Sequence, residues 1–408
     1  MAGKQASNWA LLFILITVFL DTVGLGIIIP VLPKLIAELT GEGIGAAALY
    51  GGWLLFVFSG MQFLFAPVIG NLSDRYGRRP VLLISLAALG IDYAITGFAQ
   101  TIVWLFAARV LSGMAAATYP TANAYIADVS SPEKRAQNFG LIGAAFGLGF
   151  IVGPVIGGLL GQFGPRVPFF AAAGLSMLTV AYGYFVVPES LPEKDRRPFV
   201  LGRANPFGAF KQLSRFPLVI GLMSVVVLMK LAHDANPAVF TYYVMLKFDW
   251  SEAQIGYSMG WVGVMVIFVY GYLTRVVIPR IGETRAVFAG LSLGAIGFAG
   301  YALATEGWMM YVAITVWALF GLAGPALRAI MSNQVGADQQ GELQGGIASL
   351  ESLTAIAAPL LLTQVFWYFT SADAPVYFPG AAFMLAALCY VVAIGLFARM
   401  ERPVAAAV

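Results

Sequence analysis

The sequence predicts an all-α membrane protein whose twelve transmembrane helices form two six-helix halves. Three observations lead to this fold class. The composition is strongly apolar, the apolar runs are long without alternating in polarity, and one long polar stretch divides the chain near its middle. Together they exclude both an ordinary water-soluble domain and a membrane β-barrel.

The composition is far more apolar than that of a soluble protein. Of the 408 residues, 60% are hydrophobic and 11% are charged, and the mean hydropathy is +0.84. A typical soluble domain has about 25% charged residues. A helix crosses the hydrocarbon core with roughly 20 apolar residues, whereas the strands of a membrane barrel alternate apolar and polar positions. Because the apolar runs are unbroken, we expect the membrane-spanning elements to be helices.

Twelve hydrophobic segments account for the predicted spans. Their predicted starts lie near Trp9, Leu49, Pro80, Thr101, Asn138, Pro168, Pro217, Ala253, Arg285, Trp308, Glu342 and Val376. The first segment resembles a signal peptide in its position at the N-terminus. It contains an acidic residue, Asp21, and lacks a small-residue cleavage site, so we interpret it as the first span.

The longest polar stretch, residues 188–216, begins PESLPEKDRRPF and is predicted to be a linker on the cytoplasmic side. It separates an N-terminal half, residues 1–187, from a C-terminal half, residues 217–408. Lys and Arg gather in this linker, in the tails and in the loops on the same side. The outer loops hold few of them: Lys34, Arg166 and Lys247. Since positive charge marks cytoplasmic loops, we expect a bacterial inner-membrane protein with both termini in the cytoplasm.

Several function classes lack the residues that they need. The chain has one cysteine, Cys389, and one histidine, His233, so neither an internal disulfide nor a metal site built from a His or Cys cluster is expected. No G-x-x-x-x-G-K-[ST] phosphate-binding loop occurs, which argues against an ATP-driven pump. We therefore expect no enzyme, no cofactor and no nucleic-acid partner. A receptor or scaffold would need a larger soluble region than residues 188–216.

The loop after the second span, residues 70–83, reads GNLSDRYGRRPVLL. Gly70 is expected to let two helices approach closely, and Asp74 to lie near a helix N-terminus, where negative charge is favoured. Positive charge comes from Arg75, Arg78 and Arg79. This spacing resembles the signature loop of the major facilitator superfamily, and the resemblance implies a conformational latch. A merely positive inner loop is the alternative.

The fifth span is unusually rich in glycine, with a Gly-Pro pair inside it. Glycines one turn apart on one face permit close packing with another helix, and the proline removes a backbone hydrogen bond. The positions concerned are Gly143, Gly147, Gly149, Gly153, Pro154, Gly157 and Gly158. The pattern resembles the antiporter signature of drug exporters in the same superfamily, which implies export. A generic small-residue helix interface is the alternative.

Longer segments resemble the tetracycline/proton antiporters and their relatives. These are LDTVGLGIIIPVLP in span one, MQFLFAP in span two, SLAALGIDYAITGF in span three, PFFAAAGL at span six, and PALRAIMSNQV followed by QGELQG at spans ten and eleven. The resemblance covers nearly the whole chain. It implies the major facilitator fold, in which two halves surround a central cavity and rock to give alternating access.

The same resemblance implies four substrate-binding residues inside the membrane: Asp21, Gln62, Asp92 and Arg109. Asn123 and Asn236 are two further candidates for substrate binding. An ionisable group near the bilayer centre costs at least about 2.5–3.5 kcal/mol, so each needs a reason to be there. For the two aspartates the alternative is a structural, hydrogen-bonded role, and for Arg109 it is a purely structural role. Arg109 needs a carboxylate nearby, and the sequence leaves that partner open.

The second half departs from the tetracycline antiporters at two ionisable positions. Their span-eight histidine corresponds to Val266, and their span-nine aspartate corresponds to Gly294. A span-eight glutamine of some members corresponds to Tyr270. Because the missing groups bear on coupling and on drug recognition, we expect a substrate other than tetracycline.

Span seven carries a compact group of ionisable residues. Lys230, His233 and Asp234 occupy positions i, i+3 and i+4 and therefore share one helical face. Asn236 and Pro237 follow, and Pro237 is expected to hinge the helix. The triplet is predicted to serve proton coupling, together with the two other charged residues of the second half, Arg328 and Glu351. A structural ion pair between helices is the alternative.

These patterns predict a proton-coupled antiporter that exports a small amphipathic or cationic compound by alternating access. A proton-coupled symporter or a uniporter for a metabolite is the alternative within transport. The expected partners are the small-molecule substrate, protons and the lipid bilayer, and the chain is expected to function as a monomer.

Overall fold

The computed structural model describes residues 2–116, 118–130, 132–199, 217–336 and 339–407. Within these ranges the chain forms helices joined by short connections and contains no strand, which confirms the predicted all-α class. The second part of the predicted linker, residues 200–216, lies outside the described residues. Its first part contains one 3₁₀ turn, η1 (Glu193–Asp195).

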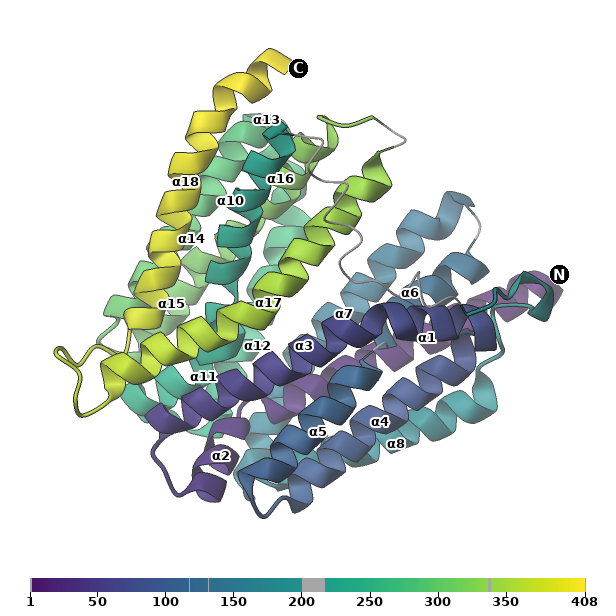
Figure 1. Ribbon diagram of the computed structural model, residues 1–408, viewed down its shortest axis with the longest axis horizontal. Coiled ribbons are helices and arrows are strands. Elements are labelled where there is room, and N and C mark those ends of the chain that lie inside the picture. Colours follow the sequence, from purple (N-terminus) through teal and green to yellow (C-terminus); the bar gives the residue numbers. More distant parts are fainter. Residues whose placement is uncertain (1, 117, 131, 200–216, 337–338, 408) are drawn as a thin grey trace. The chain divides into compact units, whose positions relative to one another are not determined.

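Figure 1 labels the helices in chain order. The helices before the linker are α1 (Ala2–Ile28), α2 (Leu32–Thr40), α3 (Ile44–Tyr76), α4 (Arg78–Phe98), α5 (Ile102–Ala115), α6 (Thr118–Val129), α7 (Pro132–Gly161) and α8 (Val167–Val186). Those after it are α10 (Pro217–His233), α11 (Ala235–Phe248), α12 (Glu252–Phe268), α13 (Thr274–Ile281), α14 (Glu283–Leu303), α15 (Gly307–Ala318), α16 (Ala323–Ser332), α17 (Gln340–Thr370) and α18 (Ala381–Ala407). A π-helical turn, η3 (Val269–Leu273), continues α12, and a 3₁₀ turn, η4 (Leu319–Leu322), joins α15 to α16.

Ten helical stretches in the described part of the chain are long and apolar enough to cross a membrane. The remaining two predicted spans are each made of two shorter helices, α5 with α6 and α10 with α11. All twelve predicted hydrophobic segments are therefore helical. The break between α10 and α11 follows from Pro237, because proline has no backbone N–H to donate to the carbonyl one turn earlier.

Most of the predicted helix starts lie within two residues of those in the structure; the eighth segment, predicted from Ala253, begins at Glu252. Three helices begin earlier than the starts predicted at Trp9, Leu49 and Asn138, namely at Ala2, Ile44 and Pro132. The last segment, predicted from Val376, begins later, at Ala381. The preceding residues instead form a turn, in which the backbone N–H of Phe378 donates to the carbonyl of Phe369 at 2.9 Å.

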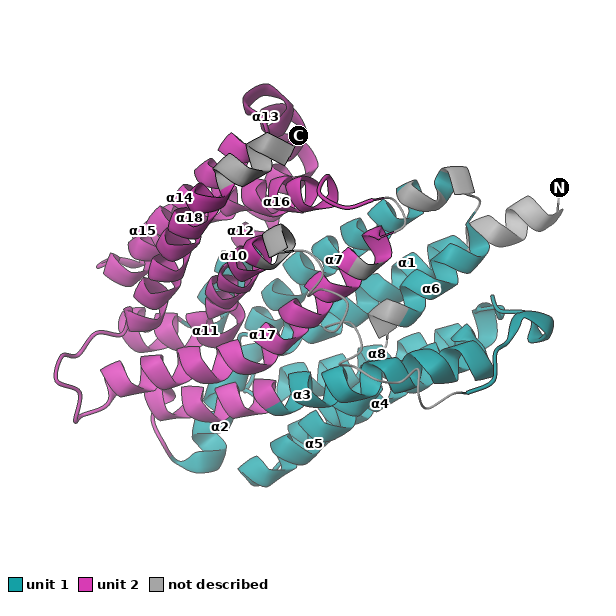
Figure 2. Ribbon diagram, turned by 45° about the horizontal axis from the view of Figure 1, so that its top comes forward, with its two compact units in different colours: residues 1–41, 57–206, 251–260 teal, residues 42–56, 207–250, 261–408 magenta. Residues whose placement is uncertain are grey.

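The chain divides into two compact units, shown in two colours in Figure 2. Unit 1 comprises Met1–Gly41, Val57–Pro206 and Ser251–Gly260, and unit 2 comprises Glu42–Phe56, Phe207–Trp250 and Trp261–Val408. The first part of α3 thus belongs to unit 2, and the first turns of α12 belong to unit 1. The units are interleaved along the sequence, although most of each lies on one side of the linker.

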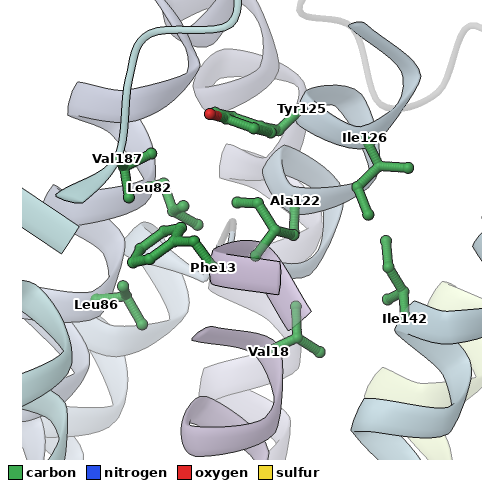
Figure 3. Packing of buried hydrophobic residues seen from close by; sticks show 10 residues of the cluster. Phe13, Val18, Leu82, Leu86, Ala122, Tyr125, Ile126, Ile142 and Val187 are labelled. Carbon is green, nitrogen blue, oxygen red and sulfur yellow. The ribbon is translucent and has the colours of Figure 1, made fainter. Parts of the chain in front are cut away.

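Unit 1 has a buried core where α1, α4, α6 and α7 meet (Figure 3). Its members are Phe13, Ile14, Val18, Leu82, Leu86, Ala122, Tyr125, Ile126, Ile142 and Val187. Inside a bilayer such packing is favoured by van der Waals contact rather than by escape from water. The Tyr125 hydroxyl, at the edge of this core, donates a hydrogen bond to the carbonyl of Pro188 at 2.9 Å. This bond links the segment after α8 to α6.

The glycines of α7 form its contact with α1, as predicted for the antiporter-like helix. A Cβ atom added at Gly149, Gly153 or Gly157 would lie 2.7, 2.7 or 2.0 Å from a carbonyl oxygen of α1, those of Phe19, Val23 and Ile27 respectively. On the α1 side, a Cβ at Gly26 would lie 2.6 Å from the Pro154 ring. The two backbones therefore approach so closely that no side chain fits between them at these positions.

One expectation for this helix is corrected. Gly143 and Gly147 lie on no tight interface, because a Cβ atom at either position would meet nothing within 4 Å. The helix runs through Pro154 to Gly161. Gly158 belongs to a different face, where a Cβ atom would lie 2.3 Å from the carbonyl oxygen of Glu252 in the first turn of α12.

Unit 2 has an aromatic core. Phe298 and Tyr390 stack with their ring centroids 5.6 Å apart, and Phe320 lies 4.8 Å from Tyr390. A Cβ atom at Gly294 would lie 2.9 Å from the Tyr390 ring, so the glycine is required by this packing. The neighbouring Cys389 is also buried, with 7% of its surface exposed.

Candidate functional site

Unit 1 contains a cavity of about 480 Å³ that reaches α1, α3, α4, α5 and α7. Its lining is Asp21, Leu25, Phe58, Gln62, Ser85, Leu89, Ser112, Ala115, Ala116 and Phe146. Two predicted substrate-binding residues, Asp21 and Gln62, are among them. The Asp21 Oδ1 atom is buried and accepts no hydrogen bond from the described residues, and no ion pair in the described chain involves this carboxylate. The cavity is thus mostly apolar and carries one acidic group without a counter-charge.

Asp92 and Arg109 form an ion pair inside unit 1. The Arg109 guanidinium donates from Nη2 to Oδ2 of Asp92, and Asp92 is fully buried. This contact supplies the carboxylate that Arg109 was expected to need. Neither residue is among those lining the cavity, although Arg109 lies over the ring of the cavity residue Phe58, at 5.9 Å. The pair therefore stands behind the cavity wall, and its negative charge is already balanced.

The two predicted asparagines lie elsewhere. Asn123 is half-buried on α6 and is not among the residues that line the cavity. Asn236 is in unit 2, in the first turn of α11, where it lies beside the Tyr301 hydroxyl. Of the six predicted substrate-binding residues, Asp21 and Gln62 are thus the ones among those that line this cavity.

The span-seven triplet stands at the junction of α10 and α11. Lys230 Nζ donates to Oδ1 of Asp234, and His233 Nδ1 lies 3.7 Å from the same oxygen. The Asp234 side chain is 7% exposed, whereas that of His233 is 47% exposed. One buried carboxylate therefore faces two basic groups, as the i, i+3, i+4 spacing predicted.

Arg328 and Glu351, expected to support this triplet, contact each other instead. Arg328 Nη2 donates to Glu351 Oε1 at 2.7 Å and links α16 to α17. No ion pair among the described residues joins either of them to Lys230 or Asp234. Each of the two side chains already has a partner of opposite charge. This removes the electrostatic reason for either of them to pair with the triplet.

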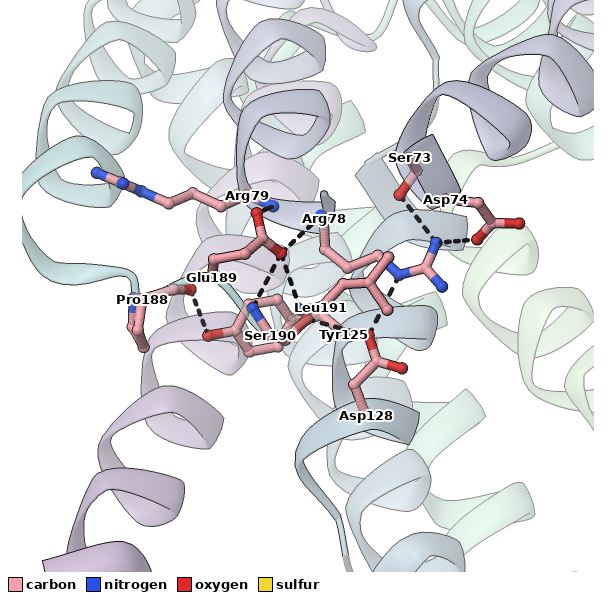
Figure 4. A network of polar contacts seen from close by, with 10 residues as sticks. All are labelled: Ser73, Asp74, Arg78, Arg79, Tyr125, Asp128, Pro188, Glu189, Ser190 and Leu191. Carbon is pink, nitrogen blue, oxygen red and sulfur yellow. Dashed lines mark hydrogen bonds and ion pairs between the residues drawn. The ribbon is translucent and has the colours of Figure 1, made fainter. Parts of the chain in front are cut away.

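The loop between α3 and α4 forms a dense polar network (Figure 4). Arg78 Nη1 donates to Asp74 Oδ1 at 2.6 Å and to Ser73 Oγ at 3.1 Å, and Arg78 Nε donates to Asp128 Oδ2 on α6 at 3.2 Å. Arg75 stacks on the ring of Tyr76 at 5.1 Å. Arg78 is thus the centre of the predicted latch.

Glu189, which the sequence analysis assigned to the linker, completes this network. Its carboxylate accepts the backbone N–H groups of Arg78 at 2.8 Å and Arg79 at 3.2 Å, which are the first residues of α4. It also accepts the N–H groups of Ser190 and Leu191. Negative charge at a helix N-terminus is favourable, so Glu189 stabilises the start of α4. An acidic residue in the P-E-S turn directly after a span was the available signal.

Two expectations for the loop are therefore corrected. The carboxylate at the N-terminus of α4 is Glu189, while Asp74 pairs with Arg78 one turn later. Gly70 makes no close helix contact, since a Cβ atom there would meet nothing within 4 Å. The glycine with a structural requirement is Gly77, which precedes α4 with φ of 103°.

Residues 14–359 match the family model of the Major Facilitator Superfamily. The class C tetracycline resistance protein of Escherichia coli is 41% identical over 386 residues, with 95% of this chain and 96% of the relative covered. The class D protein of Salmonella ordonez is 34% identical over 395 residues, with 96% and 98% covered. This likeness extends over nearly the full length of both relatives.

Solved structures of other transporters share the fold. A bacterial homologue of the human lysosomal transporter Spinster has a TM-score of 0.78 at 15% identity, with 98% of each chain covered. The nucleoside transporter NupG has a TM-score of 0.74 at 15% identity, with 96% of this chain and 99% of that chain covered. The family match, the relatives and this shared architecture agree: the chain belongs to the major facilitator superfamily, as a multi-pass membrane transporter related to the tetracycline resistance proteins and not as an enzyme.

Proposed function

We propose that the protein is a proton-coupled antiporter that exports a small amphipathic compound carrying a positive charge, and that it acts as a monomer. The observation that carries this proposal is the unpaired Asp21 in an otherwise apolar cavity of unit 1. The relatives named for tetracycline resistance support a proton-coupled transporter, and the glycine-rich α7 favours export.

The lining of the cavity matches an amphipathic cation. Ligand pockets of about 300–1,000 Å³ with apolar walls and a few polar groups bind molecules of drug size. Phe58 and Phe146 supply aromatic surface, and aromatic faces attract cations. Asp21 supplies the opposite charge, and Gln62, whose side chain donates to the carbonyl of Ala116 at 3.4 Å, supplies a further polar group. A neutral sugar or an anion would leave the carboxylate uncompensated.

Ethidium, a fluorescent amphipathic cation, provides the test. Purified protein in liposomes with an imposed pH gradient should move ethidium against the proton flux, and a pH-sensitive dye should report the protons. Asp21→Asn should strongly weaken ethidium binding. Glu306→Gln, which removes an exposed acid in the turn before α15, is the matched control and should bind normally.

Three outcomes would contradict the proposal. Ethidium movement that ignores the pH gradient would indicate a uniporter. Movement in the same direction as the protons would indicate a symporter. Equal ethidium binding by wild type and Asp21→Asn would mean that the substrate does not bind at Asp21 in the cavity.

The proposed location is the inner membrane of a bacterium, with both termini in the cytoplasm. The concentration of Lys and Arg on one side of the predicted topology supports this orientation. Reporter fusions after Phe199 and at the C-terminus should both give cytoplasmic signals. A periplasmic signal from either fusion would contradict the orientation.

A further inference from the structure

The junction between α10 and α11 has the geometry of a local hinge. Helix α10 ends at His233 and α11 begins at Ala235, with Asp234 between them. Pro237 cannot donate to the carbonyl of His233, while the next residue, Ala238, donates to the carbonyl of Asp234 at 3.1 Å. The backbone around the His-Asp pair therefore lacks one of the hydrogen bonds that would hold it rigid.

The hinge carries a carboxylate shared by two bases. Asp234 Oδ1 accepts a hydrogen bond from Lys230 and lies 3.7 Å from His233 Nδ1, whereas Oδ2 accepts none from the described residues. With His233 neutral, the lysine and the aspartate balance each other. With His233 protonated, the triplet gains a net positive charge, and Asp234 can pair with either base.

The surroundings give His233 both access and a second interaction. Its side chain is 47% exposed, and its ring lies 5.8 Å from Trp317 and 6.4 Å from Phe320. Both rings are tilted against the imidazole, at 38° and 41°, and pack beside it. A proton can thus reach His233 from the accessible side, while Asp234 stays buried behind it.

Other ionisable groups near the triplet do not replace it. Tyr390 on α18 lies near Asp234, with Tyr270 and Cys389 close to that tyrosine in turn. The charged residues of α16 and α17, Arg328 and Glu351, are paired with each other. Free tyrosine and cysteine are neutral at physiological pH, whereas histidine changes its charge near that pH. Of the groups around the hinge, His233 and Asp234 are therefore the pair suited to gain and lose a proton.

We propose that His233 and Asp234 form the proton-carrying site of the transport cycle. In this scheme Lys230 holds Asp234 ionised while His233 is neutral, and a proton on His233 draws the carboxylate away from Lys230 at the hinge. The proposal rests on the antiport function proposed above and assigns its two ions to separate places. The cationic substrate binds at Asp21 in unit 1, and the proton binds at the triplet in unit 2.

The chain's single histidine permits a direct test. Full-length protein carrying isotope-labelled histidine, purified with a tag that contains no histidine, gives one imidazole signal in magnetic resonance spectra. Antiport requires that proton and substrate exclude each other, and linkage makes that exclusion reciprocal. At mildly acidic pH, ethidium should therefore convert the His233 signal from its protonated to its neutral form. A His233 signal that is indifferent to ethidium would overturn the proposal.

Transport variants supply an independent measurement. His233→Gln and Asp234→Asn should lose gradient-driven ethidium accumulation and the pH dependence of ethidium binding, while exchange of ethidium without a gradient persists. Asp234→Glu should restore part of the coupling. Lys247→Gln, which removes a lysine of α11 that contacts Tyr243 and the carbonyl of Ala302, is the matched control and should stay coupled.

The outcomes separate this proposal from the proposed function. If wild-type protein shows no proton-driven ethidium movement, the antiport proposal fails, while the response of the His233 signal still reports on the triplet. If wild-type transport is coupled and both His233→Gln and Asp234→Asn keep the pH dependence, the antiport stands and the triplet is overturned. Loss of that dependence in Asp92→Asn alone would place the proton site in unit 1.

Discussion

The two units satisfy their buried charges in opposite ways. In unit 1, Asp92 and Arg109 form a closed pair, and Arg78 and Glu189 are surrounded by partners. In unit 2, Asp234 is shared between Lys230 and an exposed histidine. Each aspartate keeps one oxygen, Asp92 Oδ1 or Asp234 Oδ2, without a hydrogen bond from the described residues, so the two sites differ in the number of bases beside the acid.

This difference indicates where exchange takes place. Asp92 has one basic partner and no competing base in the described chain, so the Asp92–Arg109 pair is suited to holding α4 against α5. An acid with two competing bases changes its partner when one base is protonated. The unpaired Asp21 is the corresponding exchangeable group of unit 1, and it faces the cavity instead of a counter-charge.

The largest effect is expected from breaking the closed pair. Arg109→Gln leaves Asp92 buried without a counter-charge, which costs about 3–5 kcal/mol of folding free energy. Lys230→Gln should cost less, because His233 remains beside Asp234 as a second base. Unfolding titrations in detergent measure both. The double variant Asp92→Asn/Arg109→Gln should recover part of the loss, and equal losses for Arg109→Gln and Lys230→Gln would remove the contrast between the units.

A smaller effect is expected from the helix contact of unit 1. Gly157→Ala places a Cβ atom 2.0 Å from the carbonyl oxygen of Ile27, and overpacking of this kind costs about 1–3 kcal/mol. Gly143→Ala on the same helix meets nothing within 4 Å and is the control. Thermal unfolding should show a loss for the first variant and none for the second. Similar stability of the two would mean that α1 and α7 separate easily.

Removing the charge of Glu189 from the predicted latch should lower the folding stability by about 1 kcal/mol or less. Glu189→Gln keeps the size of the side chain but removes the negative charge from the N-terminus of α4, where charge contributes about 0.3–1 kcal/mol. Glu193→Gln, in the same segment but exposed, is the control. Stability of the two variants at low ionic strength checks this. A loss for Glu193→Gln as large as that for Glu189→Gln would contradict a specific role for the cap.

The smallest effect is expected for tetracycline resistance when the protein is expressed. Because Val266 and Gly294 stand where the tetracycline antiporters have ionisable groups, expression should raise tetracycline resistance little or not at all. Gly294→Asp should not create tetracycline resistance, because the Tyr390 ring occupies the space next to that position. Minimal inhibitory concentrations measure this directly. A large rise in resistance that Asp92→Asn abolishes would show that the departures in unit 2 do not set the substrate.

The sequence predicted the helices well because an unbroken apolar run of membrane length can satisfy its backbone hydrogen bonds within the bilayer only as a helix. It also predicted the triplet, since i, i+3 and i+4 positions of one helix meet by geometry alone. The spacing of Gly149, Gly153 and Gly157 correctly predicted a close helix contact. It did not predict that Gly143 and Gly147, on the same helix, contact no other helix closely. Whether a glycine meets a neighbour depends on how the other helix crosses it, which spacing does not encode.

Contacts between distant segments were harder to predict. Arg109 was known to need an acid, but only the packing of α4 against α5 identifies it as Asp92. Glu189 was assigned to a linker because a polar turn after a span looks solvent-exposed, whereas it caps a helix 111 residues earlier. Arg328 and Glu351 were expected at the triplet, yet each finds a closer partner in the other. In each case the decisive contact joins two separate segments of the chain.

Cys389 gives the molecule a useful chemical property. Its thiol is buried on α18, and buried thiols in apolar surroundings react slowly. A cysteine introduced at an exposed position would therefore be the only readily labelled thiol, without prior removal of the native one. Two such cysteines, one in each unit, would carry a pair of spin labels whose separation can be followed as ethidium or protons are added.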